Sequence, residues 1–397
     1  MKILMILISY DFPTDIRVEK EARALLAAGH QVTLVCENRK QRPAREQWKG
    51  IDIIRLPPQY VWWRQLNTGL LFFTFRSPVW ERQIDRIVAE EKPDAIHVHD
   101  LPFVGPGLRI ARRHHVPLVA DLHENFPDHC RTRQPTLSNP VERGMFDPER
   151  FDRYERQVTP QCDRVIVVVQ EAIARLEEVG VARERIFVVG NAEDVTAVPE
   201  HLEPVTLPEG ALKLMYVGGL QSNRGLDTAI RAMPKIIKQI PSALLVIVGG
   251  GVYQSALEQL TRELGLTDVV TFKGQQPFEK VHSYINAGDI CLVPHTESPE
   301  INTTMPHKLF QYMYLKKPVI VSSAKPLARV VNDAHCGKVF ESANPDAFAN
   351  CVIALQDPAV RQQLGENGHR AVLDRYSWQQ ESKELVKLYA TLTPEPA

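Results

Sequence analysis

The sequence predicts an α/β protein with two doubly wound parallel sheets. The chain has 397 residues, which is enough for two or more domains. Strand-like and helix-like segments alternate through both halves, as βαβ units of a parallel sheet do. Between the halves, residues 190–210 combine prolines and acidic residues without periodicity, as interdomain linkers do. We therefore expect a first domain at 1–195, a linker at 196–210, a second domain at 211–375 and a C-terminal helical segment at 376–397.

The first half begins with an apolar run at 2–9, which we interpret as a buried strand. This run is too short to span a bilayer and lacks a small-residue cleavage site, and no other stretch is long and charge-free enough to cross one. We therefore expect a cytoplasmic protein, with the inner face of the membrane as a second location. A helical segment follows at 17–29, where Gly29 suits the helix C-terminus. Further strands are predicted at 30–37, 51–56, 94–100, 117–124, 163–170 and 184–190.

Composition excludes some classes of function. Acidic and basic residues nearly balance, with 48 Asp and Glu against 47 Lys and Arg. This balance gives no indication of a nucleic-acid partner. The six cysteines are scattered and form no CxxC pair. Free thiols in a reducing compartment fit this pattern better than a disulfide framework or a zinc site.

Polar side chains follow two predicted strands of the first half. DAIHVHD ends on His99 and Asp100, and PLVADLHE carries His123 near its end. Ligands of doubly wound sheets bind at the carboxyl ends of strands, so these residues are candidates for a site. The spacing of His97 and His99 also allows a metal site, but we favour hydrogen-bonded imidazoles. No GxGxxG follows the first strand, which argues against an NAD-dependent dehydrogenase.

Residues 57–80 break the alternation and are rich in aromatic side chains. Across 39–86, basic residues outnumber acidic ones. Aromatic and basic side chains without a spanning length are typical of a surface that lies in a membrane interface. Two other interpretations stay open. One is the mouth of an acceptor pocket for a lipid-linked sugar, and the other is a core helix with ordinary surface arginines.

The second half repeats the alternation and adds glycine-rich turns after two of its strands. Gly218 and Gly219 follow the first of these strands, and Gly249 and Gly250 follow the second. Glycine at such a position permits close approach of the backbone to a ligand. Strands are predicted at 211–220, 242–251, 268–274, 289–294 and 318–323, and helices at 226–239, 254–264, 277–287 and 359–394.

Residues 289–321 are predicted to form strand, loop, helix and strand. Thr303 and Thr304 are expected to cap the helix, and Pro306 suits its first turn. Free N–H groups at a helix start bind anions, and Lys308, about one turn in, can reach an anion held there. A phosphate or pyrophosphate ligand is one interpretation, and an ordinary βα unit with a solvated lysine is the other.

The run PHKLFQYMYLKKPVIV at 306–321 resembles the donor-site signature of the retaining glycosyltransferases of family 4, which have the GT-B fold. In that family the segment usually holds two glutamates, which here fall on Thr303 and Gln311. The amide of Gln311 can still hydrogen-bond a ribose hydroxyl, and Glu297 and Glu300, just upstream, are the candidate carboxylates. Lys316 stands where glycine is usual. The residues that match are Met313, Pro318, Val319 and Ile320.

The resemblance extends along nearly the whole chain. It implies two Rossmann-like domains that face a cleft, with a C-terminal helix that returns to the first domain. It also implies that His123 is an active-site histidine near the donor sugar and that His99 and Asp100 line the acceptor side. Arg224 falls on a basic, phosphate-binding position, whereas Gly219 falls where an arginine is common. The expected donor-binding residues are Gly218, Gly219, Arg224, Gly249, Gly250, Gly274, Glu300, Thr303, Thr304, Lys308 and Gln311.

The implied function is hexosyl transfer from a nucleotide-sugar donor to an acceptor hydroxyl with retention, in the synthesis of cell-envelope polysaccharide or glycoconjugate. No metal or other cofactor is expected. The expected partners are the donor, a sugar or lipid-linked acceptor, and a membrane surface contacted through 57–80. Because both family glutamates are replaced, an alternative is a catalytically weak or inactive sugar-nucleotide-binding homologue that acts as a partner subunit.

Overall fold

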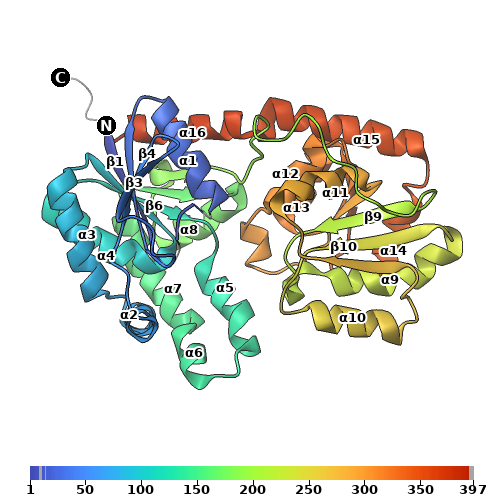
Figure 1. Cartoon of the computed structure of the whole chain (residues 1–397), viewed down its shortest axis with the longest axis horizontal. Coiled ribbons are helices and arrows are strands. Elements are labelled where there is room, and N and C mark those ends of the chain that lie inside the picture. Colours follow the sequence, from blue (N-terminus) through green and yellow to red (C-terminus); the bar gives the residue numbers. More distant parts are fainter. Residues whose placement is uncertain (9–10, 14, 393–397) are drawn as a thin grey trace. The chain divides into compact units, whose positions relative to one another are not determined.

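The structure is a computed structural model that describes residues 1–8, 11–13 and 15–392 (Figure 1). It divides into two compact units, which we describe separately. Unit 1 comprises Met1–Gly190 and Glu381–Ala397, and unit 2 comprises Asn191–Gln380. The last five residues of the predicted C-terminal segment, 393–397, lie outside the described residues.

Unit 1 contains an eight-stranded sheet with the order β3-β4-β2-β1-β5-β6-β7-β8. Neighbouring strands are parallel, except that β3 and β4 are antiparallel. β5 and β6 are buried along their whole length, as expected for parallel strands covered on both faces. The strands are β1 (Lys2–Leu7), β2 (Gln31–Cys36), β3 (Arg45–Trp48), β4 (Ile51–Arg55), β5 (Ala95–His99), β6 (Leu118–Leu122), β7 (Arg164–Val167) and β8 (Ile186–Val188).

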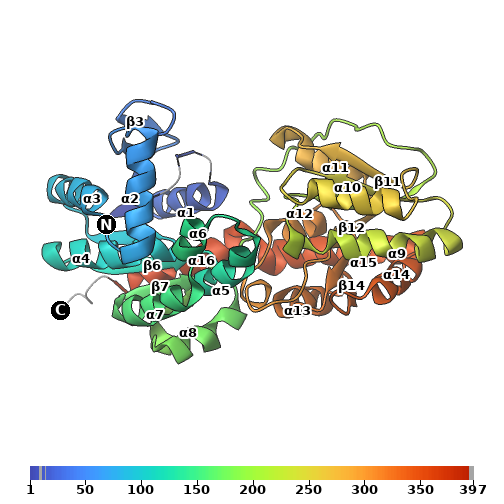
Figure 2. The ribbon, with the colours of Figure 1, turned by 90° about the horizontal axis from the view of Figure 1, so that it is seen from below.

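Helices surround this sheet, and Figure 2 shows α2 in front of it when the structure is seen from below. The C-terminal helix α16 (Trp378–Ala390) belongs to unit 1 from Glu381 onward, which confirms its predicted return to the first domain. Its Leu385, Leu388 and Tyr389 are fully buried. The other helices are α1 (Ile16–Ala27), α2 (Val61–Thr74), α3 (Pro78–Glu91), α4 (Val104–His114), α5 (Phe126–Arg133), α6 (Pro140–Met145), α7 (Pro148–Val158) and α8 (Ile173–Val179).

Unit 2 contains a six-stranded parallel sheet with the order β11-β10-β9-β12-β13-β14. Figure 1 shows α9, α10 and α14 on one side of this sheet and α11, α12 and α13 on the other. The strands are β9 (Leu212–Val217), β10 (Ala243–Val248), β11 (Val270–Gly274), β12 (Ile290–Val293), β13 (Val319–Ser322) and β14 (Gly337–Phe340). The helices are α9 (Leu226–Gln239), α10 (Gln254–Glu263), α11 (Val281–Ala287), α12 (His307–Tyr314), α13 (Lys325–Ala334), α14 (Pro345–Ile353) and α15 (Pro358–Ala371).

The predicted α/β architecture with two doubly wound sheets is confirmed. The strand order reverses between β1 and β5 in unit 1 and between β9 and β12 in unit 2. Ligands of such sheets bind at these switch points, beyond the carboxyl ends of the strands. The sequence did not predict β3 and β14, because both strands are short and half-exposed and therefore lack a continuous apolar run.

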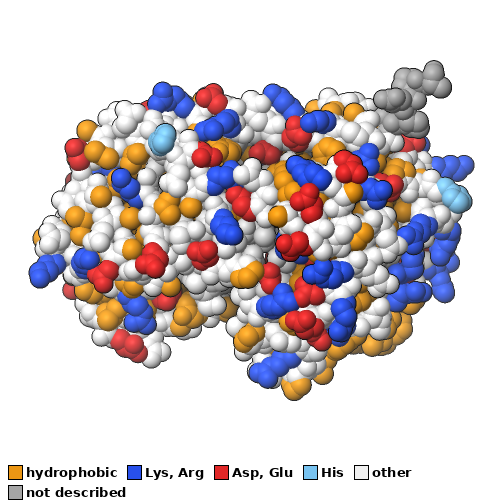
Figure 3. Space-filling view, turned by 180° about the vertical axis from the view of Figure 1, so that it is seen from behind, with side chains coloured by type: hydrophobic (Ala, Val, Ile, Leu, Met, Phe, Trp, Pro, Cys, Tyr) orange, Lys and Arg blue, Asp and Glu red, His pale blue; other side chains and the backbone are white. Residues whose placement is uncertain are grey.

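The surface of unit 1 carries a mixed patch. Figure 3 shows Lys and Arg side chains gathered over α3 and α4, next to a group of hydrophobic side chains over α2. Within the described residues, none of the helices combines the length and the apolar character that crossing a membrane requires.

Candidate functional site

In unit 1, the carboxyl ends of β5 and β6 bring four polar side chains together. His99 ends β5, and Asp121 of β6 lies opposite it in the parallel register. His123 follows β6, and its Nε2 lies 3.0 Å from Asp121 Oδ2 and 3.2 Å from His99 Nδ1. The other ring nitrogen, Nδ1, lies 3.4 Å from Asp100 Oδ1. The structure thus places the three predicted catalytic residues, His99, Asp100 and His123, in one cluster.

The two carboxylates hold His123 in its protonated state. Burial opposes a charge on the ring, but Asp121 and Asp100 outweigh it and raise the pKa of His123 to about 10. Burial and the neighbouring His97 lower the pKa of His99 to about 3. At neutral pH, His123 is therefore an imidazolium and His99 is neutral. A general base needs a pKa near the working pH, so His123 is better suited to stabilising charge than to abstracting a proton.

Arg17 of α1 lies buried beside this cluster and neutralises it. Its Nη2 lies 3.0 Å from Asp121 Oδ1 and 2.9 Å from Glu21 Oε1, and its Nη1 donates to the carbonyl of Val189 at 3.0 Å. Burial acts against ionisation of Asp121, but Arg17 and His123 hold the pKa of that carboxyl well below its usual range. Neither Arg17 nor Asp121 was among the predicted site residues. The position of Asp121 two residues before His123, on the same face of the strand, was the available signal.

The His-x-His motif lies in a group that could in principle bind a metal. Glu21, His97, His99 and Asp121 place their ligand atoms within 4.8 Å of one another. Arg17, however, already supplies positive charge to both carboxylates. Burial also raises the pKa of Glu21 to about 8, even though Arg17 lowers it. This set therefore fits a hydrogen-bonded ion-pair network better than a cation site.

The C-terminal helix completes the network. The hydroxyl of Tyr389 in α16 lies 2.8 Å from His97 Nδ1. The ring of His97 stacks on that of His99, with 4.4 Å between the centroids. Tyr389 therefore holds the imidazole that supports His99, a role that the apolar spacing of the tail did not indicate.

A cavity of about 200 Å³ opens next to His123. Its polar wall is formed by His99, Asp100 and His123 together with the carboxylates of Asp15 and Glu124. Asp100 has a φ of 68°, a backbone conformation that is rare outside glycine and is often found at functional sites. Its apolar wall is formed by Leu71 and Phe72 of α2 together with Ile8, Pro102, Phe103 and Phe126.

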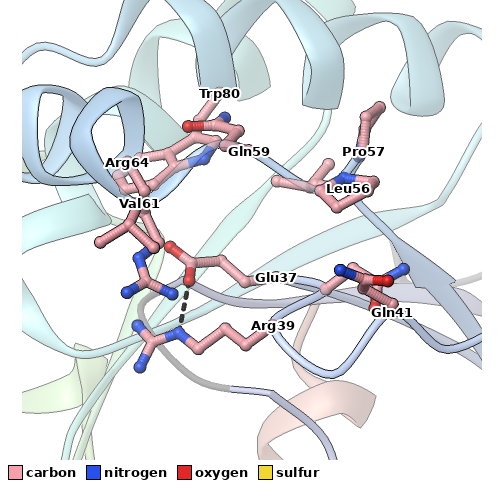
Figure 4. A pocket seen from close by; sticks show the side chains of 11 residues that line it. Glu37, Arg39, Gln41, Leu56, Pro57, Gln59, Val61, Arg64 and Trp80 are labelled. Atoms are coloured by element: carbon pink, nitrogen blue, oxygen red, sulfur yellow. Dashed lines mark hydrogen bonds and ion pairs between the residues drawn. The ribbon is translucent and has the colours of Figure 1, made fainter.

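A second cavity of unit 1, of about 150 Å³, lies next to the carboxyl ends of β2 and β4 (Figure 4). Arg39 Nε donates to Glu37 Oε2 at 2.7 Å. Glu37 Oε1 and Gln59 Nε2 are buried and have no hydrogen-bond partner in the described part of the chain. Arg64 of α2 lines the same cavity. With the amides of Asn38 and Gln41, which also line it, the cavity offers one carboxylate, three amides and two guanidinium groups, a set that can bind hydroxyl groups of a ligand.

In unit 2, the glycine turns lie at the switch point between β9 and β12. Gly218 has a φ of 144°, and a side chain there would collide with Lys308 Nζ. Gly249 has a φ of 132° and faces the carbonyl oxygen of Gly218 too closely for a side chain. The chain itself therefore requires these two glycines. Gly250 and Gly274, by contrast, have no atom closer than 3.8 Å to an added Cβ, so open space adjoins them.

The side-chain nitrogen of Lys308 in α12 is buried and has no counter-ion within the described residues. Lys308 Nζ lies 3.7 Å from the centroid of the Tyr216 ring. This nitrogen has no hydrogen-bond partner among residues 1–8, 11–13 and 15–392. Burial and the charge of Arg224 lower the pKa of Lys308 well below its usual range. Such a group is costly to bury unless an anion binds it.

Arg224 acts electrostatically on Lys308, and both cationic side chains act on His295. Arg224 Nε donates to Gln221 Oε1 at 2.9 Å, which leaves its terminal nitrogens for other partners. Burial, then Arg224 and Lys308, lower the pKa of His295 well below its usual range. Neither ring nitrogen of His295 has a hydrogen-bond partner within the described residues. His295 was not among the predicted site residues, although its position two residues after β12 at the switch point was a signal.

The predicted start of the donor-site helix is wrong. α12 begins one residue before Lys308, and its N-cap residue is Pro306. Thr303 ends a short 3-10 turn, and Thr304 is extended. The hydroxyl of Thr303 donates to the carbonyl of Pro299 at 2.9 Å, so it closes its own turn instead of capping α12. Lys308 is consequently the second residue of the helix and not a residue one turn in.

The remaining predicted donor residues lie along the same segment. Glu300 is buried at the start of the 3-10 turn. Gln311 is half-buried and lies three residues after Lys308 on α12. Glu297, the other upstream carboxylate, accepts from Asn302 Nδ2 at 3.2 Å and from Ser323 Oγ at 2.8 Å. Gly219 is exposed, and an added Cβ would lie 3.2 Å from the side chain of Gln221.

Two family models match the chain in tandem. A glycosyl transferase 4-like domain matches residues 15–192, which include the histidine cluster. A domain described as glycosyl transferases group 1 matches residues 198–371, which include Arg224 and Lys308. Together the two matches extend over most of both units.

Similar proteins agree with these matches. An uncharacterized glycosyltransferase from Methanocaldococcus jannaschii is 24% identical over 388 residues, which cover 93% of this chain and 91% of that protein. A D-inositol 3-phosphate glycosyltransferase from Nocardiopsis dassonvillei is 27% identical over 78% of this chain and 73% of that protein. The solved sucrose-phosphate synthase from Thermosynechococcus elongatus superposes with a TM-score of 0.80 at 22% identity and covers 98% of both chains. The chain therefore belongs to the family 4 type of glycosyltransferases with the GT-B fold.

Proposed function

We propose that the protein transfers a sugar from a nucleotide-sugar donor to an acceptor hydroxyl with retention of the anomeric configuration. The single observation that carries the donor assignment is the buried ammonium of Lys308, which has no anion among the described residues. Arg224 adds a second positive charge nearby. A diphosphate would supply the missing negative charge, and guanidinium binds phosphate in two-point fashion.

The proposed reaction conserves charge and atoms. The bond between the sugar C1 and the phosphate oxygen breaks, and its electron pair stays on that oxygen. The acceptor oxygen bonds C1 from the same face, and its proton passes to the phosphate oxygen. Lys308 and Arg224 stabilise the negative charge that develops on the diphosphate, which is the usual large contribution in such a transfer. We propose that these two cations act without a bound metal, so that transfer persists in EDTA.

We assign the acceptor to the cavity beside His123 in unit 1. The imidazolium of His123 can donate a hydrogen bond or stabilise negative charge at the polar wall. The apolar wall of Leu71 and Phe72 suits an acceptor that carries a nonpolar part next to its hydroxyl.

Similar proteins suggest which donor and which acceptor class to test first. The solved structure of HepE from Anabaena was obtained in complex with UDP-glucose, so UDP-glucose is the first donor to test. Another protein with this fold is described as a glycosyltransferase involved in lipopolysaccharide biosynthesis. We therefore propose cell-envelope glycoconjugates as the first acceptor class.

A thermal-shift series with UDP-, GDP-, ADP- and dTDP-glucose tests the donor assignment, because a ligand that binds only the folded state raises its melting temperature. We expect one nucleotide class to stabilise the wild type but not Lys308→Met. The proposal fails if no nucleotide sugar stabilises the protein, or if Lys308→Met responds like the wild type.

The alternative, a sugar-nucleotide binder without turnover, rests on the replacement of both family glutamates by Thr303 and Gln311. The family matches and the named relatives favour an enzyme. Radiolabelled donor separates the two: hydrolysis or transfer that disappears in His123→Ala supports the enzyme, whereas binding without any turnover supports the alternative.

A further inference from the structure

The distribution of polar and apolar residues on α2 is inverted. Helices packed on a sheet bury their apolar side chains and expose polar ones. In α2, the buried residues are Asn67 and Leu71. Trp62 is 64% exposed and Leu66 is 55% exposed, whereas Asn67, the residue after Leu66, is 3% exposed. The exposed large apolar side chains of this segment are Tyr60, Val61, Trp62, Trp63, Leu66, Leu70 and Phe73.

These side chains form one continuous stripe. Trp62, Leu66, Leu70 and Phe73 recur at i, i+4, i+8 and i+11, and Trp63 flanks them on the same side. We call this stripe the α2 face. Soluble proteins rarely expose such a contiguous apolar surface unless it binds something.

α2 is held firmly on its other side, so the exposure of the α2 face is a fixed property of the fold. Asn67 Nδ2 donates to Gln59 Oε1 at 2.8 Å. Phe72 makes edge contacts with Phe146 and Phe151, with ring centroids 5.4 Å and 5.8 Å apart.

The segment that carries the α2 face holds basic side chains and no carboxylate. Carboxylates occur on the neighbouring α3, where Glu81 lies 4.0 Å from Arg76 Nε and Asp85 lies 2.7 Å from Arg113 Nη1. No Asp or Glu occurs between residues 56 and 80. Arg76, just after the helix, is 60% exposed. Figure 3 shows basic side chains gathered over α3 and α4 next to the hydrophobic group over α2. The exposed arginines of these two helices are Arg82, Arg86, Arg112 and Arg113.

We propose that the α2 face docks on an anionic lipid bilayer. Tryptophan and tyrosine favour the headgroup boundary, leucine and phenylalanine favour the acyl region, and arginines bind anionic headgroups. A second copy of the chain fits less well, because a symmetric contact would set Arg76 against a segment that offers no carboxylate. The α2 face thus lies on the bilayer without crossing it.

If the function proposed above holds, docking of the α2 face also determines where the acceptor enters. The inner side of α2 contributes Leu71 and Phe72 to the His123 cavity, and its first turns contribute Val61 and Arg64 to the cavity of Figure 4. One helix therefore separates the lipid surface from both cavities. An acceptor anchored in that bilayer would reach them along α2.

Vesicle flotation tests the docking. We expect the wild type to float with phosphatidylcholine vesicles that contain phosphatidylglycerol, and less with phosphatidylcholine alone. Leu70→Asp places a charge in the stripe and should weaken binding by about tenfold or more. Val360→Asp is the matched control, because Leu70 and Val360 are both 39% exposed and Val360 lies in unit 2. Arg82→Gln and Arg86→Gln should each weaken binding to anionic vesicles by about fivefold.

Fluorescence adds a measurement of depth. Trp62 and Trp63 are two of the five tryptophans, and Trp80 is buried. Brominated lipids should quench the wild type but not the double variant Trp62→Phe, Trp63→Phe. Absence of binding to anionic vesicles at low salt would overturn the proposal. So would a dimer of the wild type that Leu70→Asp converts to a monomer. The thermal shift that a nucleotide sugar causes should be the same in Leu70→Asp as in the wild type, because Leu70 lies outside unit 2. A failure of membrane docking can therefore be told apart from a failure of the donor assignment.

Discussion

Both units bury cations at a switch point, but only one of them neutralises its cations. In unit 1, Asp121 contacts both Arg17 and His123, and a second carboxylate, Asp100, lies 3.4 Å from His123. In unit 2, the side-chain nitrogen of Lys308 has no hydrogen-bond partner within the described residues, and its charged neighbour Arg224 has the same sign. From this contrast we expect that removing one partner of the neutralised cluster lowers the stability of the fold, and that an anionic ligand stabilises the unit with the unneutralised side chain.

The largest effect should come from breaking the neutralised cluster. Arg17→Met leaves the carboxylates of Asp121 and Glu21 buried without their guanidinium partner. We expect the free energy of unfolding to fall by about 3–5 kcal/mol, the usual cost of removing one partner of a buried pair. Urea denaturation of the two proteins measures the difference.

Arg45 provides a matched control. It pairs with Glu91 at 2.8 Å in the same unit but is 59% exposed. Arg45→Met should change the free energy of unfolding by no more than about 1 kcal/mol. If Arg17→Met is equally mild, Arg17 does not neutralise the histidine cluster, and the contrast between the units is lost.

The second effect concerns affinity. Lys308→Met removes the unneutralised cation, so the free protein should keep its stability or gain some, while nucleotide-sugar affinity should fall by at least about 2 kcal/mol. Isothermal titration with the donor identified by thermal shift gives this number. Lys235→Met is the control, because Lys235 pairs with Asp346 at 2.9 Å on the surface of the same unit. A Lys308→Met protein that is less stable without ligand, yet binds donor normally, would show that the ammonium has a structural role.

The two clusters should also respond to pH with opposite signs. The pKa of His123 is raised to about 10, so its stabilising contribution is complete below the usual histidine value and is lost as the pH rises through about 10. The pKa of Lys308 is lowered, so between that lowered value and its usual range the unfolded state binds more protons. In that window, stability should rise with pH. Difference curves of unfolding free energy for His123→Gln and Lys308→Met, each against the wild type, should therefore slope in opposite directions above neutral pH. Parallel slopes would contradict the assigned charge states.

The sequence predicted what local pattern and spacing determine. Strand and helix alternation located both sheets, and the strand ends located His99 and His123. The charge partners could not be predicted in this way, because they come from distant parts of the chain. Tyr389 meets His97 across 292 positions, and Arg17 meets Asp121 across 104. His295 follows a predicted strand but matches no motif, so only its burial beside Lys308 distinguishes it.

The smallest predicted effect concerns Thr303, which was wrongly predicted to cap α12. Thr303 was expected to cap α12 and so to help bind the diphosphate, but its hydroxyl donates to the carbonyls of Pro299 at 2.9 Å and Glu300 at 3.2 Å. Threonine hydroxyls compete for nearby backbone groups in this way, and spacing alone does not reveal which bond forms. Thr303→Val should therefore change donor affinity by no more than about twofold, since it removes a bond within the turn and none to the ligand. Isothermal titration of both Thr303→Val and Lys308→Met with the donor measures the two affinities. A loss of similar size in both variants would mean that Thr303 contacts the donor and that the turn rearranges when the nucleotide binds.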